Sequence, residues 1–242
     1  MFSIPTRSYK TSLTLLLFLA ARTAYAAGVV PDTSVVIVNE ENGEGTMIVR
    51  NTDNRPTLLY TNIHVLDGTP KDLVIASPTM ARIEAGGSQL VRFMLNTDKP
   101  LDKEYLDRVT FEGIPPKNPG KSQVQTLFRQ DLPLIVHPRN LPKMDRPWAN
   151  LTASISNGEV RLCNPSRYVV RLDQHVDVFP GNGSTNIKHA FLLPGEIATG
   201  QVKKLSGAAS SVRIFPATVY GYLDKSFDIP LTNRCVAPTA PQ

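Results

Sequence analysis

Short segments of alternating apolar and polar residues, separated by turn residues, run through this sequence from Val30 onward. Residues 45–51 (GTMIVRN) alternate and end at a polar turn, and residues 88–96 (SQLVRFMLN) do the same directly after a glycine pair. This period of two is typical of β-strands, and a spacing of about 8 to 14 residues without a helical repeat predicts an antiparallel β-sandwich. An α/β fold would need helices between the strands, and only residues 101–106 could supply one.

The longest strand-like segment lies near the middle of the chain, within residues 121–142 (KSQVQTLFRQDLPLIVHPRNLP). Its first half alternates, and its second half is continuously apolar until Pro138. Because proline cannot donate to a strand ladder, we expect the strand to stop there and the polar run 139–147 to act as a hinge. The sequence therefore predicts an all-β protein of two β-sandwich domains, 27–142 and 143–242, joined by a short hinge.

The first 26 residues have the features of a secretory signal peptide. A basic start at Arg7 to Lys10 precedes an apolar core of about nine residues at 13–21, and Ala24-Tyr25-Ala26 is a cleavage site of the Ala-x-Ala kind. The alternative, a buried N-terminal helix, needs a length and an amphipathicity that this run does not have. We therefore expect an exported mature chain of about 216 residues, long enough for two domains. No later run of 18 apolar residues exists, so no membrane insertion is expected.

The net charge bears on which partners the protein can bind, and the cysteine content bears on the compartment in which it folds. Removing the predicted signal lowers the net charge from +5 to about +2, which weakens the case for a nucleic-acid partner. The two cysteines, Cys163 and Cys235, both follow the proposed hinge. In an oxidising compartment such a pair forms a disulfide, and closing a loop of about 72 residues would stabilise the fold by roughly 4 kcal/mol.

The sequence carries no recognisable catalytic or metal-binding pattern. It has no nucleophile elbow, no histidine pair at ligand spacing and no phosphate-binding glycine loop. The four histidines are scattered, and we interpret each as a strand or loop residue: His64, His137, His175 and His189. We therefore expect no enzyme activity, no cofactor and no metal.

Several stretches, in order, resemble the periplasmic pilus-assembly chaperones of the PapD type, which are built of immunoglobulin-like sandwiches. The most specific stretches are the Arg-Ile-Glu-Ala-Gly-Gly turn at 82–87 with the Val-Arg strand after it, and Glu-Gly-Ile-Pro-Pro at 112–116. The others are MIVRNTDNRPTLL (47–59), PLDKEYLDRVTFEGIPP (100–116), VQTLFRQDLPLIVHP (124–138), ISNGEVRLCNPSRYVVRL (155–172) and FLLPGE (191–196).

The resemblance implies a chaperone for pilus or fimbrial subunits that delivers them to an outer-membrane usher. In this family the long strand is lent to the subunit, which lacks its own last strand, a form of β-augmentation. Counting back from Pro138, the donated face is expected at Val124, Thr126 and Phe128, with Leu132 continuing it. The alternative, that this face packs only into the protein's own core, stays open.

The resemblance breaks at two positions. Family members place an arginine where this chain has Val35 and a lysine where it has Pro133, and those two cations hold the carboxylate at the subunit's C-terminus. The candidates to replace them are Arg129 and Arg139, and the alternative for Arg129 is a solvated arginine on an exposed face. The resemblance also places Glu104 and His137 at the contact between domains.

Two rival functions remain at the level of sequence. A secreted β-sandwich pilus subunit or adhesin would carry an N-terminal donor extension, and residues 27–31 are too short for one. A periplasmic hydrolase with accessory sandwich domains lacks a nucleophile. The free protein is expected either to stay monomeric or to cap its exposed edge as a homodimer.

Overall fold

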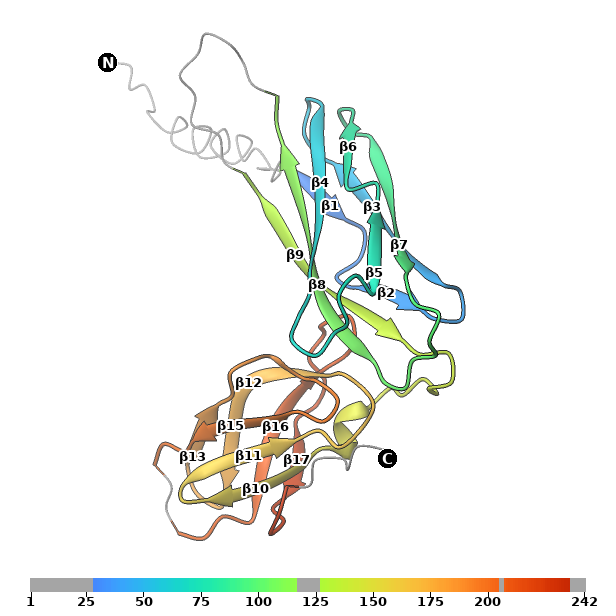
Figure 1. Ribbon diagram of the computed structural model, residues 1–242. Helices are drawn as coiled ribbons and strands as arrows, with labels where there is room; N and C mark the ends of the chain where they lie inside the picture. The colour runs from blue at the N-terminus through green and yellow to red at the C-terminus, as the bar shows by residue number, and fades with distance from the viewer. Residues whose placement is uncertain (1–27, 117–126, 205–206, 236–242) are drawn as a thin grey trace, which may run out of the picture.

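A computed structural model describes residues 28–116, 127–204 and 207–235. The described chain is all β, as predicted, and its one helical segment is a single 3-10 turn, η1 (Pro147–Asn150). Two bodies meet end to end at an angle (Figure 1): the blue-to-yellow first half and the yellow-to-red second half. The predicted division after residue 142 falls in the connection between β9 and η1.

Nine strands form the first half, in the sheet order β5-β7-β3-β2-β9-β8-β4-β6, with β1 paired to β3. Alternate residues of β3 are buried, which is the pattern that the sequence predicted for this segment. The strands are β1 (Val29–Pro31), β2 (Val36–Asn39), β3 (Glu44–Asn51), β4 (Thr57–His64), β5 (Val74–Ser77), β6 (Met80–Ile83), β7 (Ser88–Leu95), β8 (Tyr105–Ile114) and β9 (Arg129–His137).

The first hydrophobic core lies between the two layers of this half. Its largest members are Phe93 and Phe111, whose rings meet edge to face with centroids 6.3 Å apart. Gly45 on β3 lies so close to β2 that a Cβ there would stand 2.2 Å from the carbonyl oxygen of Ile37. Only glycine permits this approach, which lets β2 leave β3 and join β9.

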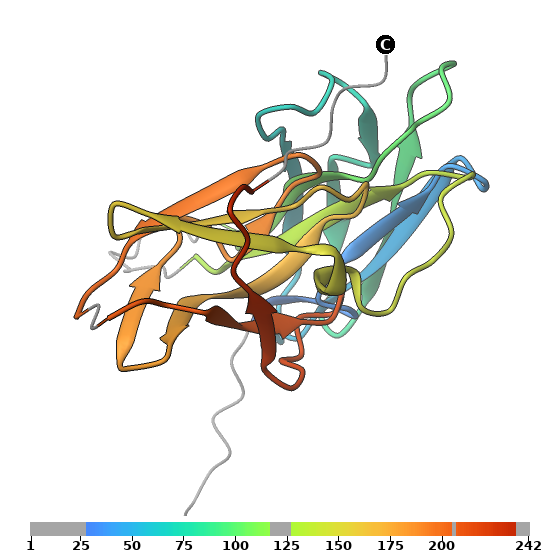
Figure 2. The same cartoon turned by 90° about the horizontal axis from the view of Figure 1, so that it is seen from below.

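The second half has one sheet of three strands and one of five, in the orders β10-β11-β15 and β13-β12-β16-β17, with β14 paired to β12. Figure 2 views this half from below, with its orange and red strands in front of the first half. The strands are β10 (Thr152–Ser156), β11 (Glu159–Cys163), β12 (Val170–Phe179), β13 (Gly183–Asn186), β14 (Phe191–Leu192), β15 (Ile197–Gln201), β16 (Ser211–Ala217) and β17 (Phe227–Pro230).

Two features of the second half bear on the predictions. Cys163 on β11 and Cys235 form a disulfide, as predicted, with their Cα atoms 5.7 Å apart. The stretch 181–185 is rich in glycine, asparagine and serine, a composition that predicts a loop, but Gly183–Asn186 forms β13 and pairs antiparallel with β12. Hydrogen bonding to a neighbouring strand outweighs local composition here. The stretch 101–106 is no helix, and its last two residues begin β8.

Candidate functional site

Half of β9 has a free edge. β8 pairs with β9 from Arg129 to Val136, but on the other side β2 pairs with it only from Leu134 to His137. Within the described residues, no strand therefore pairs with the β2 side of β9 between Arg129 and Pro133. An unpaired strand edge presents N–H and C=O groups to a further strand. Figure 1 shows this part of β9 at the outer margin of the first half.

The side chains of β9 divide between the protein's core and its surface. Leu134 and Val136 belong to the first core, and Leu132 is partly buried against it. Phe128 precedes the strand and is 52% exposed, beside Gly28, the residue before β1. Val124 and Thr126 lie outside the described residues. Of the predicted donor residues, Phe128 thus presents its ring to solvent, whereas Leu132 is engaged within the protein.

The two arginines predicted as anchors have partners within the chain. Arg129 lies directly opposite Glu112 in the β8–β9 ladder and forms an ion pair with it, with Nη2 and Oε2 2.8 Å apart. The main-chain N–H of Arg139 donates to Oε2 of Glu40 at 2.8 Å. Nη2 of Arg139 also donates to the carbonyl oxygen of Glu40 at 3.5 Å. A ligand would therefore compete with Glu112 for the side chain of Arg129 and with Glu40 for that of Arg139.

Apolar packing occupies the positions at which related proteins would have cations. Val35 is 4% exposed and lies in a cluster with Leu106, Ile135 and Val169. Pro133 is also buried. Because Val169 belongs to the second half, this cluster joins the two halves of the molecule.

Glu104 and His137 lie together at the junction. Nδ1 of His137 is 2.8 Å from Oε1 of Glu104, and the main-chain N–H of Val169 donates to Oε2 of Glu104 at 2.8 Å. Nε2 of His137 is 3.0 Å from the carbonyl oxygen of Leu141. Glu104 therefore connects the end of β9 to the second half through both carboxylate oxygens.

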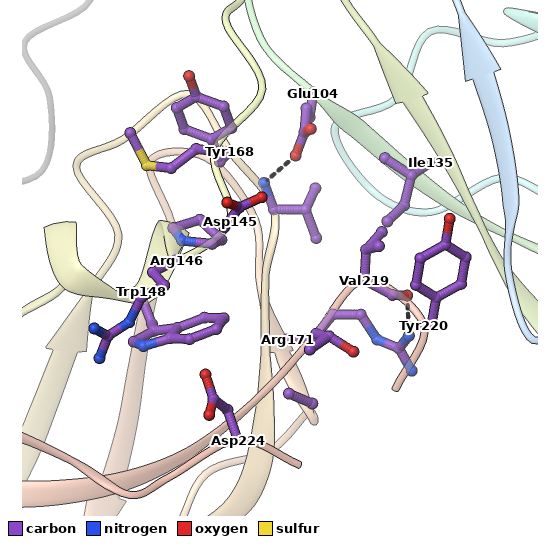
Figure 3. Close-up of a pocket in the computed structure, with 15 residues that line it drawn as sticks. Glu104, Ile135, Asp145, Arg146, Trp148, Tyr168, Arg171, Val219, Tyr220 and Asp224 are labelled. Carbon is purple, nitrogen blue, oxygen red and sulfur yellow. Dashed lines mark hydrogen bonds between the residues drawn. The ribbon is translucent and has the colours of Figure 1, made fainter. Parts of the chain in front are cut away.

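A cavity of about 550 Å³ lies between the halves. Figure 3 shows its lining residues, with Ile135 from the first half above Val219 and the Arg171 side chain below it. Nη1 of Arg171 donates to the carbonyl oxygen of Val219 at 2.6 Å. The next residue, Tyr220, accepts a hydrogen bond from Oγ of Ser34 at 2.6 Å, so the loop 218–224 touches both halves.

Two further arginines, which no sequence motif singled out, lie near this junction. Burial, and then the nearby Arg108 guanidinium, lower the pKa of Arg171. Arg108 lies on β8 opposite Pro133 and pairs with Asp131, Nε to Oδ1, at 2.9 Å. No local sequence signal marks either residue, because their proximity depends on strand register and on the packing of the two halves.

Two kinds of feature are absent from the part of the chain that the structure describes. It contains no group of three or more His, Cys, Asp or Glu side chains that could hold a metal ion. It also contains no helix that is long and apolar enough to cross a membrane.

Comparisons with known proteins fit this arrangement. Residues 28–142 match the model of the N-terminal domain of PapD, a pili and flagellar-assembly chaperone. The chain is 40% identical to an uncharacterised fimbrial chaperone of Escherichia coli K12, YhcA, over 81% of this chain and 88% of that protein. The fold is similar to a chain of the Salmonella enterica SafA pilin–SafB chaperone complex, with a TM-score of 0.68 and 21% identity, over 86% of this chain and 98% of that one. The YadV chaperone gives a TM-score of 0.67 at 21% identity, over 84% and 100%. This chain belongs to the family of PapD-type pilus-assembly chaperones.

Proposed function

We propose that this protein holds exported pilus subunits in the periplasm by lending them the free edge of β9, and that an outer-membrane usher then takes them over. The observation that carries the proposal is the unpaired edge between Arg129 and Pro133, preceded by the exposed side chains of Leu127 and Phe128. A subunit strand added there would gain main-chain hydrogen bonds and pockets for alternate side chains. Family membership does not favour the alternative of a pilus subunit or adhesin.

A free edge with apolar residues is an aggregation hazard unless a partner covers it. In the complex, the subunit is that partner. In the free protein, a second copy of the chain can cover the edge, which gives a homodimer. Solved structures with a similar fold support the first partner, since one is a pilin–chaperone complex and another is a chaperone–tip adhesion subunit complex.

The proposed donor residues are Val124, Thr126, Phe128 and Leu132. Phe128 is the best supported of the residues that the structure describes, because about half of its surface is available for burial in a subunit. Burying such a ring fully would contribute about 1.5 to 3 kcal/mol. Leu132 is already packed against the first core, so only the remaining exposed part of its side chain can contact a subunit.

The proposal includes the processing and division of the chain. Residues 1–26 direct export and are removed, 27–142 form the strand-donating domain, and 143–242 form the domain with the disulfide. The Glu104–His137 contact sets the relation between the domains. The work of the protein is binding, and we assign it no catalytic residue.

Co-expression with neighbouring exported subunits, followed by co-purification from the periplasm, tests the proposal. Val124→Ser with Phe128→Ser should sharply lower the recovery of subunit while the chaperone itself stays folded, and Phe128→Ser alone should lower it less. Met80→Ser is the matched control, because Met80 is 55% exposed on β6, a different strand. Equal recovery with the double variant and the unmodified protein would rule out β9 as the donor.

A further inference from the structure

The free edge of β9 carries one cation and one acid on its outward face. Side chains alternate between the two faces of a strand, so Arg129 and Asp131 share one face, and Leu132 lies on the other, where it packs against the first core. The side chain of Arg129 is 60% exposed and that of Asp131 is 53% exposed. A strand that adds to β9 would therefore lie beside a positive position and, two residues later, a negative one.

The contacts with β8 engage only part of each charged group. Nε and Nη2 of Arg129 both donate to Oε2 of Glu112, at 3.0 and 2.8 Å. Nε of Arg108 donates to Oδ1 of Asp131 at 2.9 Å, and its Nη2 donates to the main-chain oxygen of Asp131. Within the described part of the chain, Nη1 of Arg129 and Oδ2 of Asp131 form no hydrogen bond, so each group can take a further partner.

The position of β9 in the sheet explains why its charged side chains are the more exposed members of their pairs. β8 lies between β9 and β4, and the side chains of Glu112 and Arg108 on β8 are only 15% and 31% exposed. Arg129 and Asp131 have a neighbouring strand on one side alone. A strand added on the other side would supply their missing neighbours.

Residues directly opposite each other on adjacent strands have Cβ atoms about 4.5 to 5.5 Å apart, so opposite charges there stabilise the pairing and like charges destabilise it. We propose that Arg129 and Asp131 select the subunit strand by charge: the strand that adds to β9 carries an acidic side chain beside Arg129 and a basic side chain beside Asp131. In a parallel strand the acid comes two residues before the base, and in an antiparallel strand the order is reversed. This inference rests on the proposed function.

The charge pattern would give the bound strand a preferred register. Main-chain hydrogen bonds form with any strand, and apolar side chains such as Phe128 add affinity without fixing the register. A slip by one residue turns the charged side chains of the added strand to the core face. A slip by two residues places either the acid beside Asp131 or the base beside Arg129, and both are like-charge contacts.

The test measures the affinity of each chaperone variant, at low salt, for an exported subunit that co-purifies with the unmodified protein. Arg129→Gln and Asp131→Asn each remove one charge and keep a hydrogen-bonding group for the partner on β8. Each should weaken binding about 1.5- to 5-fold, the range expected for an exposed cross-strand ion pair. Arg129→Lys keeps the charge and should retain most of the affinity.

The matched control is Arg213→Gln in the second half. Arg213 on β16 lies directly opposite Asp228 on β17 and forms an exposed ion pair with it, with Nε and Oδ1 2.7 Å apart. This variant also breaks a cross-strand pair, but away from β9, and should leave the affinity for the subunit unchanged. Thermal unfolding of every variant shows whether its fold is intact.

A second arm identifies the subunit's side of the contact. Each charged side chain of the subunit is neutralised in turn and combined with each chaperone variant in a double-mutant cycle. One acidic residue should lose its effect in Arg129→Gln, and one basic residue two positions away should lose its effect in Asp131→Asn. Both coupling energies should shrink as salt is added, because the contacts are exposed.

The inference is wrong if either coupling is absent, so that the effects of the chaperone and subunit substitutions simply add. Arg129 and Asp131 would then act only within the chaperone. If Phe128→Ser still weakens binding in the same assay, the proposed function stands while the charge selection fails. Failure of every subunit to co-purify with the unmodified protein would instead contradict the proposed function.

Discussion

Arg108 on β8 is the direct cross-strand neighbour of Pro133 on β9. The resemblance to the family implies a lysine at the position of Pro133, and Arg108 places a cation on the same face but one strand away. Arg108 is tied to Asp131 through both its side chain and its main-chain oxygen. Arg171, at the junction of the two halves, forms no ion pair among the described residues and donates instead to the carbonyl oxygen of Val219.

Removing the Glu104 carboxylate should weaken the junction. Glu104→Ala leaves the buried N–H of Val169 and the ring of His137 without their partners, so we expect the free energy of unfolding to fall by about 2 to 3 kcal/mol. Urea unfolding followed by fluorescence measures it. Glu84→Ala is the control and should change little, because its pair with Arg82 is exposed. Equal effects of the two substitutions would show that Glu104 does not hold the halves together.

The disulfide should contribute strongly to the stability of the second half. It closes a loop with a sequence separation of 72 residues, and its loss through Cys163→Ala with Cys235→Ala should cost roughly 4 kcal/mol in the chain-entropy model. Mass spectrometry of unreduced periplasmic protein should find one linked peptide pair and no alkylated thiol. Two alkylatable cysteines in fresh material would refute this prediction.

The pH dependence of stability should contain a contribution from Asp107, which is 2% exposed and accepts a hydrogen bond from the main-chain N–H of Leu66 at 2.9 Å. Burial raises the pKa of this carboxyl in the folded protein. The folded state therefore holds the proton to a higher pH than the unfolded state, whose aspartate titrates near 3.9, and stability falls as the pH rises between those two values.

Asp107→Asn removes this charge and keeps the acceptor for Leu66. The stability of the variant relative to the unmodified protein should therefore increase as the pH rises from about 4 to 7. Denaturant unfolding at several pH values measures the difference. A difference that stays constant, or that shrinks toward neutral pH, would contradict the assignment.

The sequence predicts the fold class well because strand alternation is a local property. The alternating segments 45–51 and 88–96 coincide to within one residue with β3 (Glu44–Asn51) and β7 (Ser88–Leu95), and β16 also buries alternate residues. Stretches without apolar alternation, such as β13, could not be found this way, because their hydrogen bonds come from a neighbouring strand.

Two buried asparagines show a second limit. The side-chain amide of Asn51 donates to three carbonyl oxygens, those of Arg55, Ile83 and Glu84, and Asn164 does the same for Tyr168, Leu192 and Leu193 in the second half. Each asparagine binds the backbone of a turn, at 84–87 in the first half and at 194–196 in the second. The sequences of these two turns are similar. Their partners lie up to 33 residues away in the chain, so the sequence alone does not reveal their role.

Only the part of the candidate site that depends on local sequence could be predicted. The long strand and its end at Pro138 follow from local pattern and from resemblance to the family. Arg108 and Arg171 come together only through the β8–β9 register and the packing of the second half. The resemblance to the family implies that its two cations are replaced at Val35 and Pro133, and it gives no information on other cations nearby.

Amide hydrogen exchange on β9 tests the central claim, strand addition at its free edge, most directly. The carbonyl of His137 accepts a hydrogen bond from the N–H of Glu40 on the β2 side. Because strand groups alternate in direction, the N–H groups of Arg129 and Asp131 face the same side, where β2 no longer pairs, and those of Gln130 and Leu132 face β8.

In the free protein, the N–H groups of Arg129 and Asp131 should exchange much faster than those of Gln130 and Leu132. Binding of a subunit should slow exchange at Arg129 and Asp131 to rates like those of their neighbours. If the amide hydrogens of Arg129 and Asp131 exchange equally fast with and without bound subunit, the subunit does not add a strand to this edge. The proposal that β9 is the donor strand would then be wrong.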